Sequence, residues 1–188
     1  HAIKIFLNSL YGALGTQYFR YFDQRVAESI TLSGQLAILW AEREMNVLMN
    51  NILETKDEDR VIAIDTDSIY VEMKDVISKF KPKNPVAFLD KISEEYFVPK
   101  LSKSFVELNK RVNGYENSME MAREVIADRG IWLAKKRYIL NVHNSEGVQY
   151  AQPKLKIMGI EAIKSSTPQV VRDAFKKIFR VIIEGTES

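Results

Sequence analysis

The stretch VIAIDTDSIYV, residues 61–71, decides the fold class. Two runs rich in β-branched and apolar residues flank the tetrapeptide DTDS at positions 65–68. Runs of this kind favour β-strands, and Asp and Ser are common turn residues. The stretch therefore predicts a tight β-hairpin whose tip carries Asp65 and Asp67.

Two carboxylates at one hairpin tip, between apolar strands, fit two interpretations. They repel each other and lose hydration, and a divalent cation bound by oxygen ligands would offset that cost. Magnesium commonly takes one or two protein carboxylates together with substrate phosphates. The alternative is an ordinary turn, where Asp is favoured for its hydrogen bonds to the backbone. Asp65 and Asp67 are therefore candidate magnesium ligands.

Helical patterns precede the hairpin. Apolar residues recur at spacings of three and four over residues 2–15, which predicts a helix. A longer helix is expected to begin after Asp23, a residue type favoured at helix N-caps, and to run to about Leu53. Its apolar stripe comprises Val26, Ile30, Ala37, Ala41, Met45, Leu48 and Ile52.

The residues after the hairpin predict a loop, a bent helix, further strands and a last helix. Residues 79–85 form the loop, and residues 85–112 form a helix that Pro99 should bend or split. The expected strands are 118–127, 132–142, 148–151 and 156–161, with turns at 128–130 and 144–147. The last helix takes Pro168 as its first residue and reaches about Glu184.

This element order predicts an α+β fold in which an antiparallel sheet packs on helices. A doubly wound parallel sheet needs regular alternation of strands and helices, and that alternation is absent. The 188 residues suit one domain that buries its own core.

Composition excludes several classes of protein. The absence of cysteine excludes a disulfide scaffold, a thiol nucleophile and a thiolate zinc site. The apolar runs are too short for a membrane span. The net charge of +2 means that any contact with nucleic acid must come from local clusters of cations. Because the chain opens with His1 directly in a helical pattern, we expect it to be part of a longer protein.

A polar face runs along the first helix. Lys4, Asn8 and Tyr11 share one side of the helix, opposite the leucines, and Gly12 follows. A lysine supplies a point charge for phosphate, and a glycine permits close approach of a ligand. The face therefore suits a ligand that bears phosphate and stacks its base, although a solvated polar face fits the same pattern.

A cationic run, KKRY at residues 135–138, lies in a segment with strand character. In a strand, Lys135 and Arg137 would face one way, and Lys136 and Tyr138 the other. Three cations near aromatic residues could follow a nucleic-acid backbone, and an edge strand protected by charge is the alternative.

Glu124 stands in a mostly apolar segment. It is either an accessory group of a metal site or a residue on the solvent face of a strand.

In this order, the four features resemble the family B (alpha-like) DNA polymerases, most closely the T-even-phage type. KIFLNSLYG at residues 4–12 is similar to the fingers-helix motif of that family, DTDS matches its palm metal motif, and KKRY matches its primer-duplex motif. Met158-Gly159 and the run SSTP at 165–168 resemble the passage from palm to thumb.

The resemblance implies domains and roles. Residues 1–17 would be the end of the fingers helix, 18–165 the palm, and 166–188 the start of the thumb. Lys4 would contact the triphosphate of the incoming nucleotide, Asn8 would share that surface, and Tyr11 and Gly12 would pack near the nascent base pair.

The resemblance also implies roles for the acidic and basic residues. Asp67 would be a direct metal ligand and Asp65 its neighbour, while Glu124 would be an accessory carboxylate of the palm. Lys136, Arg137 and Tyr138 would hold the primer end, and Lys135 belongs to the same motif.

The implied reaction is attack of a primer 3′-hydroxyl on the α-phosphate of a deoxynucleoside triphosphate, with two Mg²⁺ ions and primer-template DNA as partners. The family has a further catalytic aspartate upstream, so the resemblance implies that this chain needs the missing upstream part and is inactive alone, and that it could form a homodimer. It would act in the cytoplasm of the host cell, without a membrane. The alternative from another class is a non-catalytic DNA-binding or assembly module on a palm-like fold.

Overall fold

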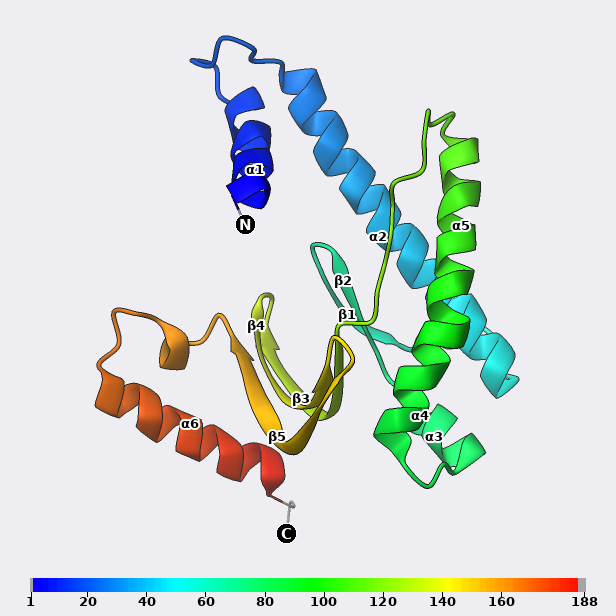
Figure 1. Ribbon diagram of the computed structural model, residues 1–188, viewed down its shortest axis with the longest axis vertical. Helices are drawn as coiled ribbons and strands as arrows, with labels where there is room; N and C mark the ends of the chain where they lie inside the picture. Colours follow the sequence, from blue (N-terminus) through cyan, green and yellow to red (C-terminus); the bar gives the residue numbers. More distant parts are fainter. Residues whose placement is uncertain (1, 186–188) are drawn as a thin grey trace. The chain divides into compact units, whose positions relative to one another are not determined.

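The structure is a computed structural model that describes residues 2–185 of the chain (Figure 1). Its helices are α1 (Ala2–Leu14), α2 (Gln24–Leu53), α3 (Lys74–Phe80), α4 (Pro85–Ile92), the π-helix η1 (Ser93–Phe97), α5 (Val98–Arg111), the 3₁₀ helix η2 (Glu161–Ile163) and α6 (Gln169–Glu184). Its strands are β1 (Val61–Asp65), β2 (Ser68–Val71), β3 (Val125–Ala134), β4 (Arg137–Ser145) and β5 (Val148–Met158). Helices and antiparallel sheets together confirm the predicted α+β class.

The chain folds into two compact units, which are described separately. Unit 1 comprises residues 1–72 and 104–119, and it contains α1, α2 and the β1–β2 hairpin. Unit 2 comprises residues 73–103 and 120–188, and it contains the sheet β3-β4-β5 with α6.

In unit 1, α2 begins and ends as the sequence predicts. Asp23 takes an extended N-cap conformation, and its carboxylate accepts the N–H of Arg25 at 3.0 Å. The second half of the helix packs with the hairpin and buries every fourth residue, namely Ala37, Ala41, Met45 and Met49. Met49 was absent from the predicted stripe, and Val26 and Ile30, which were in it, are exposed.

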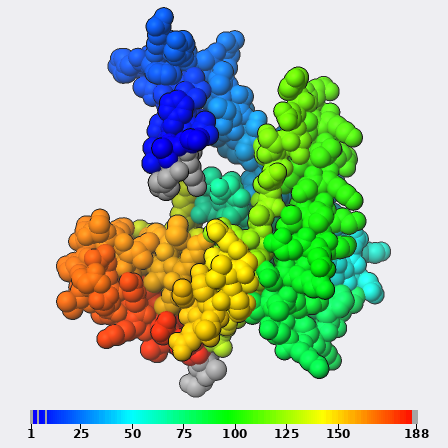
Figure 2. Space-filling model, viewed as in Figure 1, coloured from blue at the N-terminus to red at the C-terminus, as the bar shows by residue number. Residues whose placement is uncertain are grey.

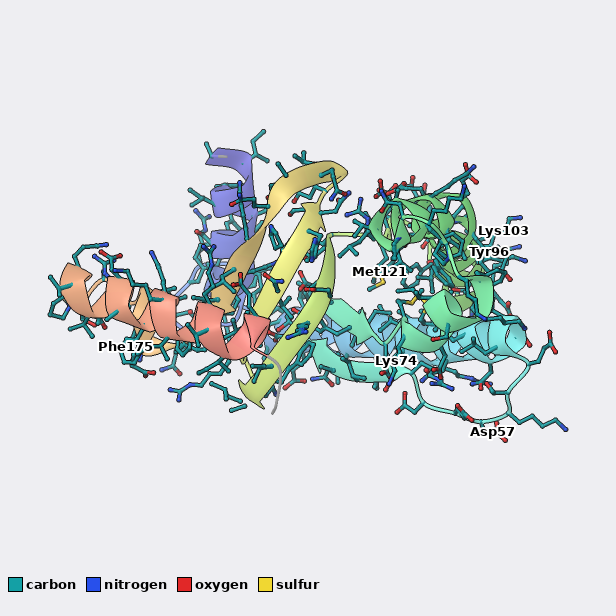
Figure 3. The ribbon with its side chains drawn as sticks, turned by 90° about the horizontal axis from the view of Figure 1, so that it is seen from below. Asp57, Lys74, Tyr96, Lys103, Met121 and Phe175 are labelled. Atoms are coloured by element: carbon teal, nitrogen blue, oxygen red, sulfur yellow. The ribbon has the colours of Figure 1, made fainter. Side chains whose placement is uncertain are left out.

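In unit 2, α6 packs on the antiparallel sheet β3-β4-β5. Ile139 of β4, Ile157 of β5 and Ile183 of α6 belong to one buried cluster, which Phe175 and Phe179 extend. Figure 3 shows α6 across the strands, with Phe175 labelled. In Figure 2 the orange and red surface of η2 and α6 is continuous with that of β5.

The structure corrects the predicted turns of this sheet. The chain continues through residues 128–130 within β3, because Gly130 pairs with Leu140 and leaves the space that the Trp132 ring and Leu140 occupy. The turn instead falls at Lys135 and Lys136, between β3 and β4. Lys136 adopts the left-handed region with a φ of 62°. The prediction that 135–138 lies within one strand, with alternating faces, was therefore wrong.

Three further boundaries differ from the prediction. The first strand of the sheet begins at Val125 and not at 118, and the segments 148–151 and 156–161 belong in large part to one strand, β5, which ends at Met158. Helix α3 extends to Phe80, so the loop is shorter than 79–85. The turn predicted at 144–147 is confirmed between β4 and β5.

The predicted break at Pro99 takes the form of a π-helix. The segment Ser93–Phe97 adopts the wider π geometry immediately before α5. Proline lacks an N–H and clashes with the preceding turn of an α-helix, so a wider turn accommodates it.

Candidate functional site

The tip of the β1–β2 hairpin places Asp65 and Asp67 on one turn. Asp65 pairs with Ser68 across the strands, so Thr66 and Asp67 form a two-residue turn. Thr66 has a φ of 55°, a left-handed conformation that β-branched residues seldom adopt. Such strain costs about 1–3 kcal/mol and is most frequent at functional sites.

Hydrogen bonds fix this tip. The Asp67 N–H donates to the Asp65 carbonyl at 2.7 Å, and the Ser68 hydroxyl donates to the same carbonyl at 3.1 Å. The Thr66 hydroxyl donates to a carboxylate oxygen of Asp65 at 3.1 Å. Asp65 is half-buried and Asp67 is exposed, so the second carboxylate is open to a ligand from solvent.

Two asparagines of α2 hold the segment that leads into the hairpin. Asn46 accepts the N–H of Arg60 at 2.8 Å and donates to the Asp59 carboxylate at 2.8 Å. Asn50 donates to the Glu58 carbonyl at 2.8 Å and accepts the Thr55 hydroxyl at 2.6 Å. These bonds tie the residues before β1 to a rigid helix and so set where the hairpin begins.

The donor set at the tip fits magnesium that arrives with a phosphate-bearing ligand. Asp65 and Asp67 offer carboxylate oxygens, which hard divalent cations prefer. Among residues 2–185, no group of three or more His, Asp or Glu side chains is arranged to hold a metal ion. Magnesium is held by one or two carboxylates plus substrate phosphates in many phosphoryl-transfer sites. The two aspartates would thus supply the protein's share of such a site.

On the polar face of α1, the structure shows the surroundings of Tyr11 and Gly12. The Tyr11 hydroxyl lies 2.9 Å from the Thr31 hydroxyl of α2, and Tyr11 lines a hollow of about 580 Å³ between the two helices. Space is open around Gly12, where a Cβ would meet no atom within 4 Å. The side chains of Lys4 and Asn8 lie outside the described part of the structure.

Glu124 is engaged by a lysine. The Lys156 ammonium lies 2.5 Å from the Glu124 carboxylate, and Glu124 lines a pocket of about 330 Å³ with Glu94, Arg123 and Glu146 among its other residues. Glu124 belongs to unit 2, whereas the aspartate pair belongs to unit 1.

Arg123, beside Glu124, has a side chain that is only 9% exposed. Its guanidinium pairs with Asp90 of α4 and donates to the Asn144 side chain at 2.8 Å. This contact holds the chain that carries Glu124 against both a helix and the sheet of unit 2.

The β3–β4 turn carries the predicted basic residues, all exposed. Lys135 and Lys136 form the turn, and Arg137 begins β4. The Arg137 guanidinium lies 3.6 Å from the Glu161 carboxylate, which also accepts the Lys164 ammonium at 2.9 Å. The pKa of Glu161 is lowered mainly by its hydrogen bond from Lys164, with a smaller contribution from Arg137. We call the residues 135–137 the cationic turn.

Tyr138 is placed differently from the basic residues. It is buried in the sheet opposite Trp132, and the two ring centroids are 6.4 Å apart. It follows the cationic turn directly in the sequence, but unlike those residues it is not exposed.

Comparison with known proteins identifies the family. The sequence matches the model of DNA polymerase family B over residues 1–188, the full length of the chain. The chain belongs to DNA polymerase family B.

Two phage proteins are among the relatives of this family B chain. The DNA-directed DNA polymerase of Escherichia phage RB69 is 46% identical over 98% of this chain, and that of Enterobacteria phage T4 is 42% identical over 98%. A DNA polymerase of Pyrococcus glycovorans is 27% identical over 97%. The chain spans only 22% of the length of each phage protein and 19% of the archaeal one.

Sequence reasoning missed several residues that shape the sites of this family B chain. Asn46 and Asn50 lie four residues apart on one face of a helix, a spacing that could have marked them as a polar pair. Lys156 and Glu161 gave no local signal, because their partners Glu124 and Arg137 lie far away in sequence.

Among the described residues, none of the helices has the length and the apolar composition that a membrane span requires.

Proposed function

We propose that this chain provides the catalytic palm of a DNA-directed DNA polymerase, together with the end of the fingers and the start of the thumb. The observation that carries the proposal is the Asp65–Asp67 hairpin tip within a chain that matches family B over its full length. In this proposal residues 1–17 belong to the fingers, 18–165 to the palm and 166–188 to the thumb.

The reaction is template-directed nucleotide addition. The oxygen of a primer 3′-hydroxyl forms a bond to the α-phosphorus of a deoxynucleoside triphosphate, and pyrophosphate leaves. Asp67 and Asp65 would hold magnesium at the hairpin tip, and Glu124 would be an accessory carboxylate of the palm. Two bound Mg²⁺ ions would lower the pKa of the attacking hydroxyl and stabilise charge on the leaving phosphates.

The remaining site residues bind and orient substrates. Lys4 and Asn8 would face the triphosphate, and Tyr11, supported by Thr31, would pack near the nascent base pair beside open space at Gly12. Orientation of this kind lowers the entropic part of the barrier.

The cationic turn would hold the primer-template duplex. Lys135, Lys136 and Arg137 are exposed and can neutralise phosphates of the DNA backbone. Tyr138, the next residue of the same motif, is buried in the sheet.

The isolated chain would need the rest of a polymerase to work. It spans 22% of each phage relative, so we expect no primer extension by the chain alone. We expect it to act in the cytoplasm of a host cell, on primer-template DNA and deoxynucleoside triphosphates.

A chimaera tests the proposal. This chain would replace the matching segment of the phage RB69 polymerase, and addition of one nucleotide to a labelled primer would be measured. The chimaera should extend the primer, and Asp67→Asn should abolish extension while duplex binding persists. Asp57→Asn, which removes an exposed carboxylate in the loop after α2 (Figure 3), is the matched control.

Two outcomes would contradict the proposal. Extension at normal rate by the Asp67→Asn chimaera would remove the metal assignment. A chimaera that folds and binds duplex, yet adds no nucleotide, would favour the non-catalytic DNA-binding module.

A further inference from the structure

Glu161 places a carboxylate beside the cationic turn of unit 2. Its Oε1 lies 3.6 Å from an Arg137 guanidinium nitrogen and 2.9 Å from the Lys164 ammonium. A negative charge at this position opposes the binding of phosphate to the neighbouring cations of the cationic turn and Lys164.

The position of Glu161 is fixed by its neighbours in the chain. Ile160 and Ala162 are buried in the core of unit 2. The Thr167 hydroxyl donates to the Glu161 carbonyl at 2.8 Å, which closes the loop after η2. The carboxylate therefore projects from an anchored segment.

The cationic turn is anchored against the same segment. Gly159 has a φ of 65°, and a Cβ on it would lie 2.0 Å from the Lys136 carbonyl oxygen. This close approach of two backbones brings the start of β4 and the residues before η2 together. The backbone of unit 2 thus keeps Arg137 and Glu161 near each other.

We propose that Glu161 is an internal counter-anion of Arg137, which holds the guanidinium until a phosphodiester of bound nucleic acid replaces the carboxylate. Glu161 is a positioning residue in this proposal, because it acts through Arg137. Its pKa is lowered, so it remains ionised at neutral pH. Because one anion replaces another on Arg137, the contribution of Arg137 to the free energy of DNA binding is smaller than it would be without Glu161.

The chemistry of the two anions supports the exchange. A guanidinium forms paired hydrogen bonds with carboxylates and with phosphates alike. The contact of 3.6 Å is longer than a normal hydrogen bond, and both side chains are about half exposed, so the pair is weak and open to competition. A phosphate in a nucleic-acid backbone also releases condensed counterions on binding, which the carboxylate does not.

The inference rests on the proposed duplex binding, and a salt titration separates the two. The binding of a fluorescent primer-template duplex to the 188-residue chain would be measured by anisotropy over a series of NaCl concentrations. Glu161→Gln should tighten binding about threefold at low salt, and should make the fall of log K with log salt steeper. Thermal unfolding would verify that each variant is folded.

Two further variants isolate the partner. In an Arg137→Gln background, Glu161→Gln should tighten binding much less, because the guanidinium that the carboxylate held is gone. Glu146→Gln removes the same charge from the turn between β4 and β5, at the opposite end of the strands, and should leave the affinity and the salt slope nearly unchanged.

Each outcome is decisive. If the unmodified chain binds no duplex in a salt-dependent way, the proposed duplex binding is wrong and this inference falls with it. If the unmodified chain binds, but Glu161→Gln binds equally or more weakly, the counter-anion role is wrong and duplex binding stands. If Glu161→Gln raises the duplex affinity equally with and without Arg137, Glu161 acts only as a general repulsive charge. That result would contradict its role as the counter-anion of Arg137.

Discussion

Gly159 illustrates how a single backbone position shapes the cationic turn. Its φ of 65° is a conformation that favours glycine, and the Lys136 carbonyl oxygen occupies the space where a Cβ would stand. A backbone carbonyl cannot rotate away as a flexible side chain can. The cationic turn can therefore approach residue 159 this closely because glycine has no Cβ.

Gly159→Ala should lower the free energy of unfolding by about 1–3 kcal/mol and weaken duplex binding, because the added Cβ displaces the cationic turn. Gly147→Ala is the control, since Gly147 has a φ of 83° but no atom within 4 Å of its Cβ position. Denaturant unfolding of both variants separates conformational strain from the steric clash. Equal losses of stability would show that the contact with Lys136 carries no cost.

Among the elements, α2 is the support of the aspartate hairpin. Its side chains Asn46 and Asn50 make hydrogen bonds to the segment 55–60, directly before β1. Hydrogen bonds of this kind satisfy backbone groups that no strand or helix pairs. The segment 55–60 is thus hydrogen-bonded to α2 and connects this helix to the hairpin.

Asn50→Ala should lower the free energy of unfolding by about 1–3 kcal/mol, because the bonds to Thr55 and Glu58 are lost from a half-buried position. Asn51→Ala, at the exposed neighbouring position of α2, should change it by less than about 0.5 kcal/mol. Urea unfolding measures both. If Asn51→Ala lowers the free energy of unfolding as much as Asn50→Ala does, the hydrogen bonds of Asn50 to the segment 55–60 do not stabilise the protein.

The N-terminus of α2 predicts a pH dependence. The pKa of Asp23 is lowered, mainly by its hydrogen bond from the Arg25 side chain and also by the backbone N–H groups that it caps. A lowered carboxyl pKa adds stability above the pKa of the unfolded chain, about 3.9, and that stability is lost as the pH falls through the folded value.

Asp23→Asn keeps a capping side chain and removes this titration. The unmodified chain should therefore lose more unfolding free energy than the variant between about pH 6 and about pH 3. Unfolding curves at a series of pH values test this. Parallel losses in both proteins would show that Asp23 carries no part of the acid sensitivity.

At the scale of the whole molecule, the sequence predicted what local patterns control. Asp23 marked the start of α2, and the β-rich runs around DTDS marked the hairpin. The β3–β4 turn was mispredicted because its cause is long-range. Asp128 accepts a hydrogen bond from Asn141, and Gly130 makes room for Leu140 and Trp132, so residues that resemble a turn remain in a strand. The pairing of Glu124 with Lys156 likewise depends on tertiary contact alone.

The outer face of α6 carries an exposed apolar stripe. Val170, Val181 and Ile182 are 81%, 72% and 55% exposed, while Phe175, Phe179 and Ile183 of the same helix take part in the core. The apolar surface of α6 is thus wider than unit 2 buries. Exposed apolar residues that gather on one helix can mark an association site in a soluble protein.

We therefore expect the isolated chain to self-associate through α6, with a second copy covering the stripe. Light scattering should give a mass above 21.7 kDa that falls toward this value on dilution. The double variant Val170→Lys and Val181→Lys should remain monomeric, since two charges on the stripe oppose burial. Val148→Lys, at an exposed valine that begins β5, should associate as the unmodified chain does. A monodisperse monomer at every concentration would show that the stripe does not join copies of this chain.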